Sequence, residues 1–378
     1  MLGIFSRGQQ KLKGMEKTTN TKEDKSLEYL DLLRRLSQEQ GVSGREAKVA
    51  ESLLKTLHPL VDEVERDRLG NVIAHKKGEG PDPHPRVMLA AHMDEIGLMV
   101  TQILEGGFLR FTPVGGIDLR TLPGQEVLIH GLSPLRGVIG AKPPHLQEPG
   151  ERKKAIPGDE LYIDTGYSKK EELEEMVPLG TMVTIERDLQ LLANDLVAGK
   201  ALDNRAGVTV LAACFQELTR LKHRADVYGV ATVQEEVGVR GAMVSSYGLA
   251  PDLAVVIDVC HGDMPGVAED EGFPLGKGPA LGLGPHVHPR LFTTLKETAQ
   301  EIGVPYQVEP SPTPAGTDAW AIQIAREGIP TALVSLPLRY MHTAVETLSL
   351  KDLKETGRLL AAFIQGLEPA FVEGLSCY

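Results

Sequence analysis

The chain has few aromatic residues, few cysteines and no long apolar run, and each shortage excludes a class of protein. Aromatic residues make up 4% of the 378 residues, with a single tryptophan, Trp320, which leaves little for stacking on bases or gripping a polysaccharide. No window approaches the roughly 18 continuous apolar residues of a transmembrane helix. The three cysteines, Cys214, Cys260 and Cys377, are odd in number and lack CxxC spacing. That pattern fits a reducing compartment and not a disulfide framework.

Positive charge is also in short supply. The chain has 40 Lys and Arg against 52 Asp and Glu, a net charge of −12, which argues against nucleic acid or an anionic membrane as a partner. We expect the N-terminal residues 1–26 to form a polar tail, neither a signal peptide nor a membrane anchor, with Met15 as an alternative start to Met1. These features together predict a soluble, cytoplasmic protein.

The order of helical and strand patterns predicts an α/β domain that is interrupted by an all-β domain. Amphipathic helical segments precede a near-continuous apolar strand over 86–100, which suggests a sheet covered by helices on both faces. Short strands and Gly/Pro turns then follow to residue 194, as in a small β-barrel or sandwich. We therefore expect an α/β domain over 27–98 and 195–378, with an inserted β domain over 99–194.

Side chains that bind metals collect at the ends of four apolar strands. They are His92 and Asp94 after "VMLAA", Glu235 and Glu236 after "VYGVATVQ", Asp258 at the end of "LAVVID", and His342 after "TALVSLPLRYM". Asp203 lies instead at a helix entrance, in "GKALDNRAG". In open α/β sheets, sites form outside the carboxyl ends of the strands, so these side chains are expected to converge.

The residue types suit a pair of metal ions. Histidines and carboxylates without cysteine form a nitrogen and oxygen set for zinc, cobalt or manganese. Two ions bridged by a carboxylate need about five ligands and a separate base to activate water. The adjacent Glu235 and Glu236 can then have different roles, one as a metal ligand and the other as the base. Taken singly, each residue has a common structural explanation, such as an N-cap for Asp203; four strand ends together favour the metal centre.

Several blocks of sequence resemble the M42 family of di-zinc aminopeptidases. This family contains the tetrahedral and glutamyl aminopeptidases, and some members carry the label endoglucanase or cellulase M. From about residue 28 onward the blocks follow the family's order: "AHMDEIGLMV", "GKALDNRAG", "VQEEVGVRGA", "VIDVCHGDMPG", "LGKGP", "AGTDAWAIQIAREGIPT" and "LRYMHTAVE". The resemblance implies a zinc-peptidase α/β fold with a PDZ-like barrel inserted. It also implies that the α/β domain is the catalytic metallopeptidase domain, and that the inserted domain over 99–194 serves oligomerisation into dimers that build a dodecameric tetrahedral shell.

The resemblance further implies a metal-binding role for five residues. Asp203 would bridge two divalent ions, with zinc favoured and cobalt as the alternative. His92 and Asp258 would complete one site. Glu236 and His342 would complete the other.

The remaining implied roles concern catalysis and substrate binding. Glu235 would be the general base, and Asp94 would orient the imidazole of His92, as metal-bound histidines usually require. Three residues of "SPTPAGTDAW" would line the substrate pocket: Gly316, Thr317 and Asp318.

The leading prediction is a metal-dependent aminopeptidase that removes N-terminal residues from short peptides. A glycoside hydrolase with paired carboxylates is one alternative, against which the scarcity of aromatic residues argues. A catalytically silent oligomeric peptide-binding scaffold is another, against which the retained Glu235 argues. The preferred N-terminal residue is open among acidic, aliphatic and broad, and we favour aliphatic or broad. A basic residue for acidic substrates could come from Lys277, Arg290 or Arg339.

Overall fold

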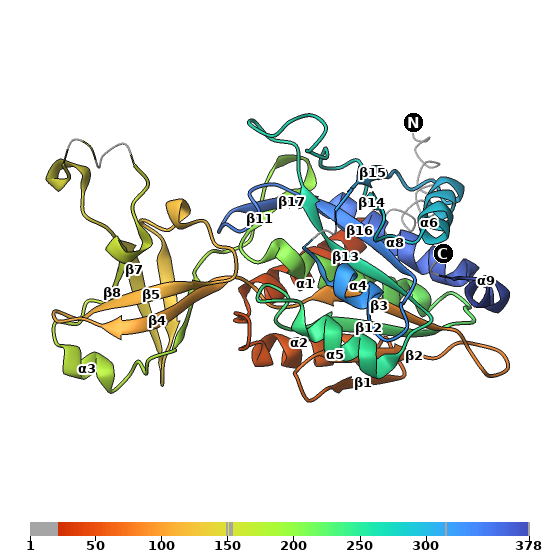
Figure 1. The fold of residues 1–378 in the computed structure, drawn as a ribbon, viewed down its shortest axis with the longest axis horizontal. Helices are drawn as coiled ribbons and strands as arrows, with labels where there is room; N and C mark the ends of the chain where they lie inside the picture. Colours follow the sequence, from red (N-terminus) through yellow and green to blue (C-terminus); the bar gives the residue numbers. More distant parts are fainter. Residues whose placement is uncertain (1–21, 149, 151–153, 314–315, 377–378) are drawn as a thin grey trace, which may run out of the picture.

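The computed structural model describes residues 22–148, 150, 154–313 and 316–376. Most of the predicted tail over 1–26 lies outside the described residues, and the remainder already belongs to helix α1 (Lys22–Gln38). Figure 1 shows a larger body of helices and strands with a smaller body of strands attached at one side. Among the described residues, no helix combines the length and the apolar character needed to span a membrane.

The larger body is built on an eight-stranded sheet. Its strands, in spatial order, are β1 (Glu63–Arg66), β2 (Val72–Lys76), β12 (Asp226–Thr232), β3 (Arg86–His92), β13 (Leu253–His261), β16 (Thr331–Leu338), β14 (Ala280–Leu283) and β15 (Gln307–Pro310). The central strands β12, β3, β13 and β16 run parallel. Their carboxyl ends therefore meet at one edge of the sheet.

Helices cover both faces of this sheet, as the sequence predicts. Along β3, Val87, Leu89 and Ala91 face one apolar core, whereas Met88 and Ala90 face another, because strand side chains alternate. The first core contains side chains of α1, α2 (Ala47–Leu57), α4 (Leu202–Leu218), α6 (Pro289–Glu301), α8 (Leu350–Gly366) and α9 (Pro369–Glu373). The second contains those of α5 (Arg240–Leu249) and α7 (Asp318–Gln323).

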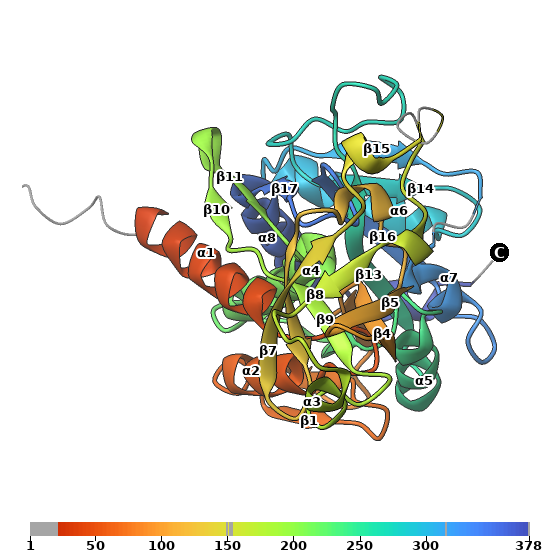
Figure 2. The ribbon, with the colours of Figure 1, turned by 90° about the vertical axis from the view of Figure 1, so that its left-hand side faces the viewer.

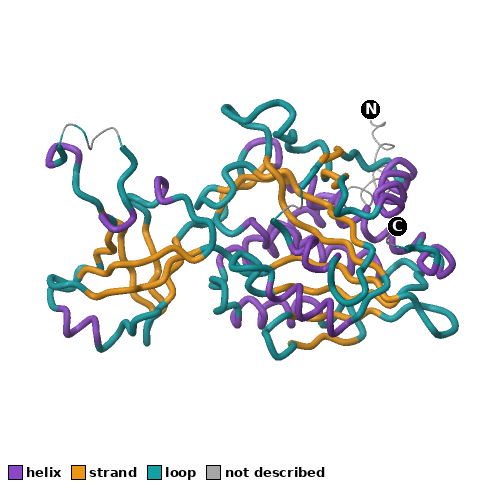
Figure 3. The backbone as a smooth tube through the Cα atoms, viewed as in Figure 1, coloured by secondary structure: helices purple, strands orange, loops and turns teal. Residues whose placement is uncertain are grey.

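The smaller body is a closed six-stranded barrel, which confirms the predicted small β domain. Its strands, in order around the barrel, are β4 (Gly97–Ile103), β5 (Phe108–Val114), β8 (Tyr162–Asp164), β7 (Pro134–Gly140), β6 (Glu126–His130) and β9 (Met182–Ile185). Figure 2 turns the barrel towards the viewer, and Figure 3 shows that α3 (Lys170–Glu174) is one of its few helical pieces. The bounds 99–194 for an inserted domain stay a prediction.

The apolar run over 86–100, expected as one strand, is divided between the two bodies. β3 ends at His92 in the main sheet, and β4 begins at Gly97 in the barrel. The charged pair Asp94 and Glu95 interrupts the run, and both side chains are buried with polar partners. Their partners, Ser43 and Lys200, lie outside the main sheet, and β3 ends before the pair.

A separate three-stranded sheet joins the segments before α4 and after β16. It consists of β10 (Gln190–Leu191), β11 (Leu196–Gly199) and β17 (Glu346–Ser349). Gly199 pairs with Glu346 across this sheet. The pairing brings the segment that enters α4 close to the segment that leaves β16.

Candidate metal centre

The side chains predicted at the strand ends do converge at the carboxyl edge of the main sheet. The set comprises His92 at the end of β3, Asp258 in β13, Glu235 and Glu236 after β12, His342 after β16 and Asp203 at the start of α4. Ligand atoms of three of them, His92, Asp203 and Glu236, lie within 4.8 Å of one another. The parallel order of β12, β3, β13 and β16 accounts for this convergence.

Asp203 lies between the two histidines. Its Oδ1 is 3.1 Å from Nε2 of His92, and its Oδ2 is 3.3 Å from Nε2 of His342. Asp258 Oδ1 lies 3.9 Å from the His92 nitrogen, and Glu236 Oε1 lies 3.4 Å from the His342 nitrogen. The five side chains therefore form two groups that share the Asp203 carboxylate. This is the arrangement that a bridging carboxylate requires.

Asp94 holds the adjacent glutamates through their backbone. Its Oδ1 accepts a hydrogen bond from the Glu235 amide (3.0 Å), and its Oδ2 accepts from the Glu236 amide (3.2 Å) and from the Ser43 hydroxyl (2.6 Å). The same Oδ1 is 3.5 Å from Nδ1 of His92. One buried carboxylate thus faces both the first ligand histidine and the turn that carries the two glutamates.

The centre holds more negative charge than its surroundings neutralise. In the part of the chain that the structure describes, its carboxylates pair only with His92 and His342 and with no Lys or Arg. Burial and the nearby Asp258 raise the pKa of Glu235 to about 10. Hydrogen bonds to Asp203 and Glu236 raise the pKa of His342 to about 11.

The other pKa shifts agree with this excess of negative charge. Burial would lower the pKa of His92, but the carboxylates around it, Glu235 and Asp203 among them, raise it well above its usual value. Burial also raises the pKa of Asp258 well above the ordinary range. Burying carboxylates without matching cations is costly. Divalent cations bound through nitrogen and oxygen would remove that cost, so the residues fit a metal centre.

The three predicted substrate residues differ in their surroundings. Asp318 is 1% exposed; its Oδ2 accepts from the Thr232 hydroxyl at 2.6 Å, while its Oδ1 has no hydrogen-bond partner among the described residues. Burial raises the pKa of Asp318 to about 6. The Thr317 hydroxyl accepts from the Ala319 amide and caps α7, and Gly316 is exposed. Of the three, only Asp318 is buried, and its negative charge helps to raise the pKa of Glu235 and of Asp258.

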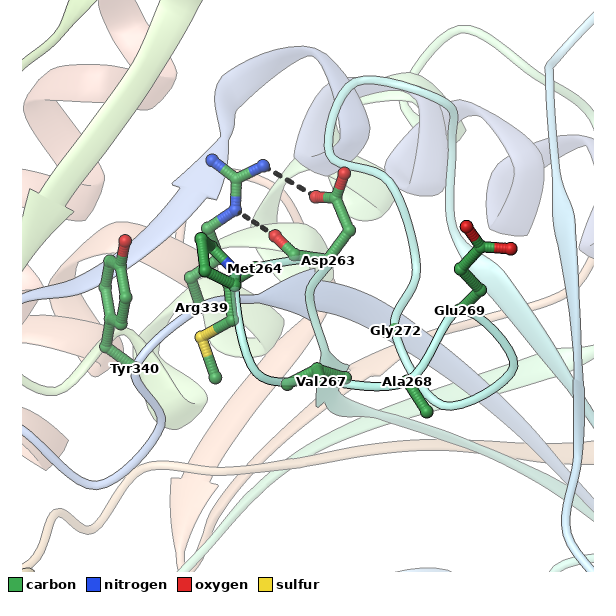
Figure 4. A pocket seen from close by; sticks show the side chains of 9 residues that line it. Asp263, Met264, Val267, Ala268, Glu269, Gly272, Arg339 and Tyr340 are labelled. Atoms are coloured by element: carbon green, nitrogen blue, oxygen red, sulfur yellow. Dashed lines mark hydrogen bonds and ion pairs between the residues drawn. The ribbon is translucent and has the colours of Figure 1, made fainter.

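A cavity of about 430 Å³ lies beyond the ends of β13 and β16 (Figure 4). Its lining residues are Asp263, Met264, Pro265, Val267, Ala268, Glu269, Gly272, Arg339 and Tyr340. Arg339 donates to the backbone carbonyl of Asp263 and, at 2.6 Å, to its carboxylate, as the dashed lines in Figure 4 show. The guanidinium is therefore already neutralised by a partner.

The other two basic candidates do not line this cavity, and His288 has a structural role. Arg290 donates to the carbonyl of Gly374 and lies over the ring of Phe371, next to α9. Lys277 is exposed in the loop before β14. His288 caps α6, so it is used by the fold.

Sequence reasoning overlooked two residues that contact the centre. The Ser43 hydroxyl donates to Asp94, a contact that no sequence pattern indicates. Glu346 lies in the block "LRYMHTAVE", and its carboxylate accepts from the backbone of Asp203 and His342. Its place in that block was the only signal available.

Comparison with known proteins gives a consistent picture. A family model described as M42 glutamyl aminopeptidase matches residues 70–359. The chain is 39% identical to the lysyl aminopeptidase of Pyrococcus furiosus over 90% of this chain and 97% of that protein. It is also similar to a solved TET aminopeptidase from the marine sediment archaeon Thaumarchaeota archaeon SCGC AB-539-E09, with a TM-score of 0.87 and 34% identity over 94% and 99% of the two chains.

A second solved structure concerns assembly. The chain superimposes on the Pyrococcus horikoshii TET1 peptidase with a TM-score of 0.80 and 33% identity, covering 90% of this chain and 100% of that one. That peptidase is described as able to assemble into a tetrahedron or a large octahedral shell.

Proposed function

The chain belongs to the M42 family of aminopeptidases, and from that premise we propose that it removes N-terminal residues from short peptides with a two-metal centre. The observation that carries the proposal is the Asp203 carboxylate, whose two oxygens face two different histidines. His92 and Asp258 would hold one ion. Glu236 and His342 would hold the other, with Asp203 shared. Zinc is the favoured ion and cobalt the alternative.

Glu235 would act as the general base. When bound, the two ions would polarise the peptide carbonyl and offset the charge of the surrounding carboxylates. Glu235 would take a proton from the attacking water and deliver it to the leaving amine. Its Oε2 lies 3.9 Å from His92 Nε2, and its side chain keeps a small exposure of 8%, so it borders the centre without being closed off. The excess of carboxylates would favour a substrate that presents a free, positively charged amino terminus.

The cavity of Figure 4 would receive the side chain of the substrate's first residue. It lies just past β13, which carries Asp258, and Tyr340 in its wall precedes His342 by two residues. Its wall combines apolar side chains, such as Val267 and Ala268, with charged ones; Arg339 is paired with Asp263, and Glu269 adds a further negative charge. An acidic side chain would find no free cation there. We therefore favour an aliphatic or broad preference over a glutamyl one.

The test is the hydrolysis of aminoacyl-p-nitroanilides of Leu, Ala, Glu, Asp and Lys, after chelation and again after adding Zn²⁺ or Co²⁺. We expect cleavage that depends on metal, with Leu and Ala ahead of Glu and Asp. Asp263→Asn should release Arg339 and raise the cleavage of the Glu derivative relative to Leu. Absence of cleavage with metal measurably bound would favour the silent scaffold. Hydrolysis of a β-glucan instead would favour the glycosidase.

Self-association and location are part of the same proposal. By analogy with the assembly of the Pyrococcus horikoshii protein, we expect dimers of this 40.9 kDa chain that build a dodecamer. Light scattering on the eluted protein would give the mass, and a monomer at micromolar concentration would contradict the expectation. A cytoplasmic location is retained as a proposal, in keeping with the free, buried thiols of Cys214 and Cys260.

A further inference from the structure

Glu346 is a buried carboxylate that joins two loops of the metal centre. It is the first residue of β17 and is 1% exposed. Its Oε2 accepts a hydrogen bond from the Asp203 amide at 3.0 Å, and its Oε1 accepts from the His342 amide at 2.9 Å. Each oxygen thus binds the backbone of a different proposed metal ligand.

The two loops need such support because their backbone is irregular. Ala201, two residues before Asp203, has φ 57°, and His342 itself has φ 62°. Tyr340 has φ 59°. Residues other than glycine disfavour this left-handed backbone region, so the surrounding structure must hold these residues in place.

No cation explains the burial of Glu346. Among the described residues, no Lys, Arg or His forms an ion pair with it; its hydrogen-bond partners there are the two backbone amides. A buried carboxyl group without an ion-pair partner is costly unless hydrogen bonds satisfy its oxygens, and burial raises the pKa of Glu346 well above its usual value. The two amide bonds are the interactions that offset this cost, and both belong to the metal centre.

We propose that Glu346 is a positioning residue, which sets the spacing between the Asp203 carboxylate and the His342 imidazole by binding both backbones. The inference rests on the proposed two-metal centre. It predicts an unequal effect on the two ions, because His92 and Asp258 are held by strands β3 and β13, whereas His342 lies in an irregular loop. The site that contains His342 should depend on Glu346 more than the site that contains His92.

The test is metal binding by the full-length apo protein, measured by competition with a chromophoric zinc chelator. The variant is Glu346→Gln, which keeps the shape of the side chain but turns an NH₂ group towards one of the two amides. Titration of the wild type should show two binding steps, and His342→Ala should identify the step that belongs to the His342 site. We expect Glu346→Gln to weaken that step by roughly 10–100-fold, the usual effect of changing a group that orients a metal ligand, and to spare the other step.

Asp352 offers a matched control. It is also 1% exposed, and its carboxylate accepts from two backbone amides, those of Gly276 (2.6 Å) and Gly278 (2.7 Å), outside the metal centre. Asp352→Asn should lower thermal stability but leave both metal-binding steps unchanged. A general loss of stability is thereby separated from a loss of ligand positioning.

The outcomes are distinct. If the wild type binds two ions and Glu346→Gln binds both with unchanged affinity, the role of Glu346 is refuted while the two-metal centre stands. If the wild type itself binds fewer than two ions, the centre and the role of Glu346 are both refuted. Should Glu346→Gln fail to fold, Glu346→Asp, which keeps the charge but shortens the side chain, should weaken the same step. Equal weakening of both steps by either variant would contradict the proposal.

Discussion

Replacement of Asp94 by asparagine should destabilise the protein and loosen the turn that carries the two glutamates. Asp94 is fully buried, and its carboxylate accepts from the Glu235 and Glu236 amides and the Ser43 hydroxyl. An asparagine side chain has one oxygen and one NH₂ group. In either orientation, at least one backbone N–H would face another donor.

The magnitude follows from the number of bonds lost. A hydrogen bond to a charged group contributes about 1.5–3 kcal/mol to stability. Asp94→Asn loses one or two such bonds, so we expect the free energy of unfolding to fall by about 1.5–6 kcal/mol. Ser43→Ala loses one such bond and leaves both backbone bonds of Asp94 in place, so it should cost about 1.5–3 kcal/mol.

The assay is urea unfolding of the metal-free protein, followed by the fluorescence of Trp320, which packs against the second apolar core from α7. Turnover of a Leu p-nitroanilide at saturating metal provides the functional readout. Asp94→Asn should lose most turnover, whereas Ser43→Ala should keep most of it. If the two variants were equally stable and equally active, Asp94 would not be what holds the Glu235–Glu236 turn.

Three further predictions concern the fold around the site. Lys200→Met breaks a buried ion pair with Glu95 (2.6 Å) and should cost about 3–5 kcal/mol in urea unfolding; no loss would contradict the pairing. Gly229→Ala would place a Cβ 2.3 Å from the Phe215 ring and should cost about 1–3 kcal/mol, seen as a lower melting temperature. Burial lowers the pKa of His130 to about 4, so the protein should lose stability as the pH falls from about 6.5 to about 4. His130→Gln should remove that part of the acid dependence, ~1–2 kcal/mol after allowance for partial exposure, and an unchanged pH profile would refute it.

The sequence predicts much of the main sheet because its pattern is simple. The unbroken apolar run of β3 indicates burial on both faces, and His92 at its end indicates the edge where ligands meet. The division of the 86–100 run could not be predicted, since Gly97 begins a strand of the barrel with the same apolar pattern. The apolar periodicity indicates which face of a strand is buried. It does not indicate whether that strand belongs to the main sheet or to the barrel.

The ligand-type residues were easier to find than the groups that support them. His92 ends one conspicuous apolar strand, Asp258 lies within a second, which continues to His261, and His342 follows a third. Glu346 follows a short loop and opens a four-residue strand, so no periodicity marks it. Its role depends on which backbone amides face it, and that is a property of tertiary structure alone.

The most direct test of the account is a paired measurement of metal content and turnover in Glu235→Gln, with Asp203→Ala beside it. Glu235→Gln should retain two ions per chain and lose most of its cleavage of a Leu p-nitroanilide, because it keeps the ligands and removes the base. Asp203→Ala should lose metal as well as turnover. Full turnover by Glu235→Gln with two ions bound would contradict the proposed role of Glu235 as the general base.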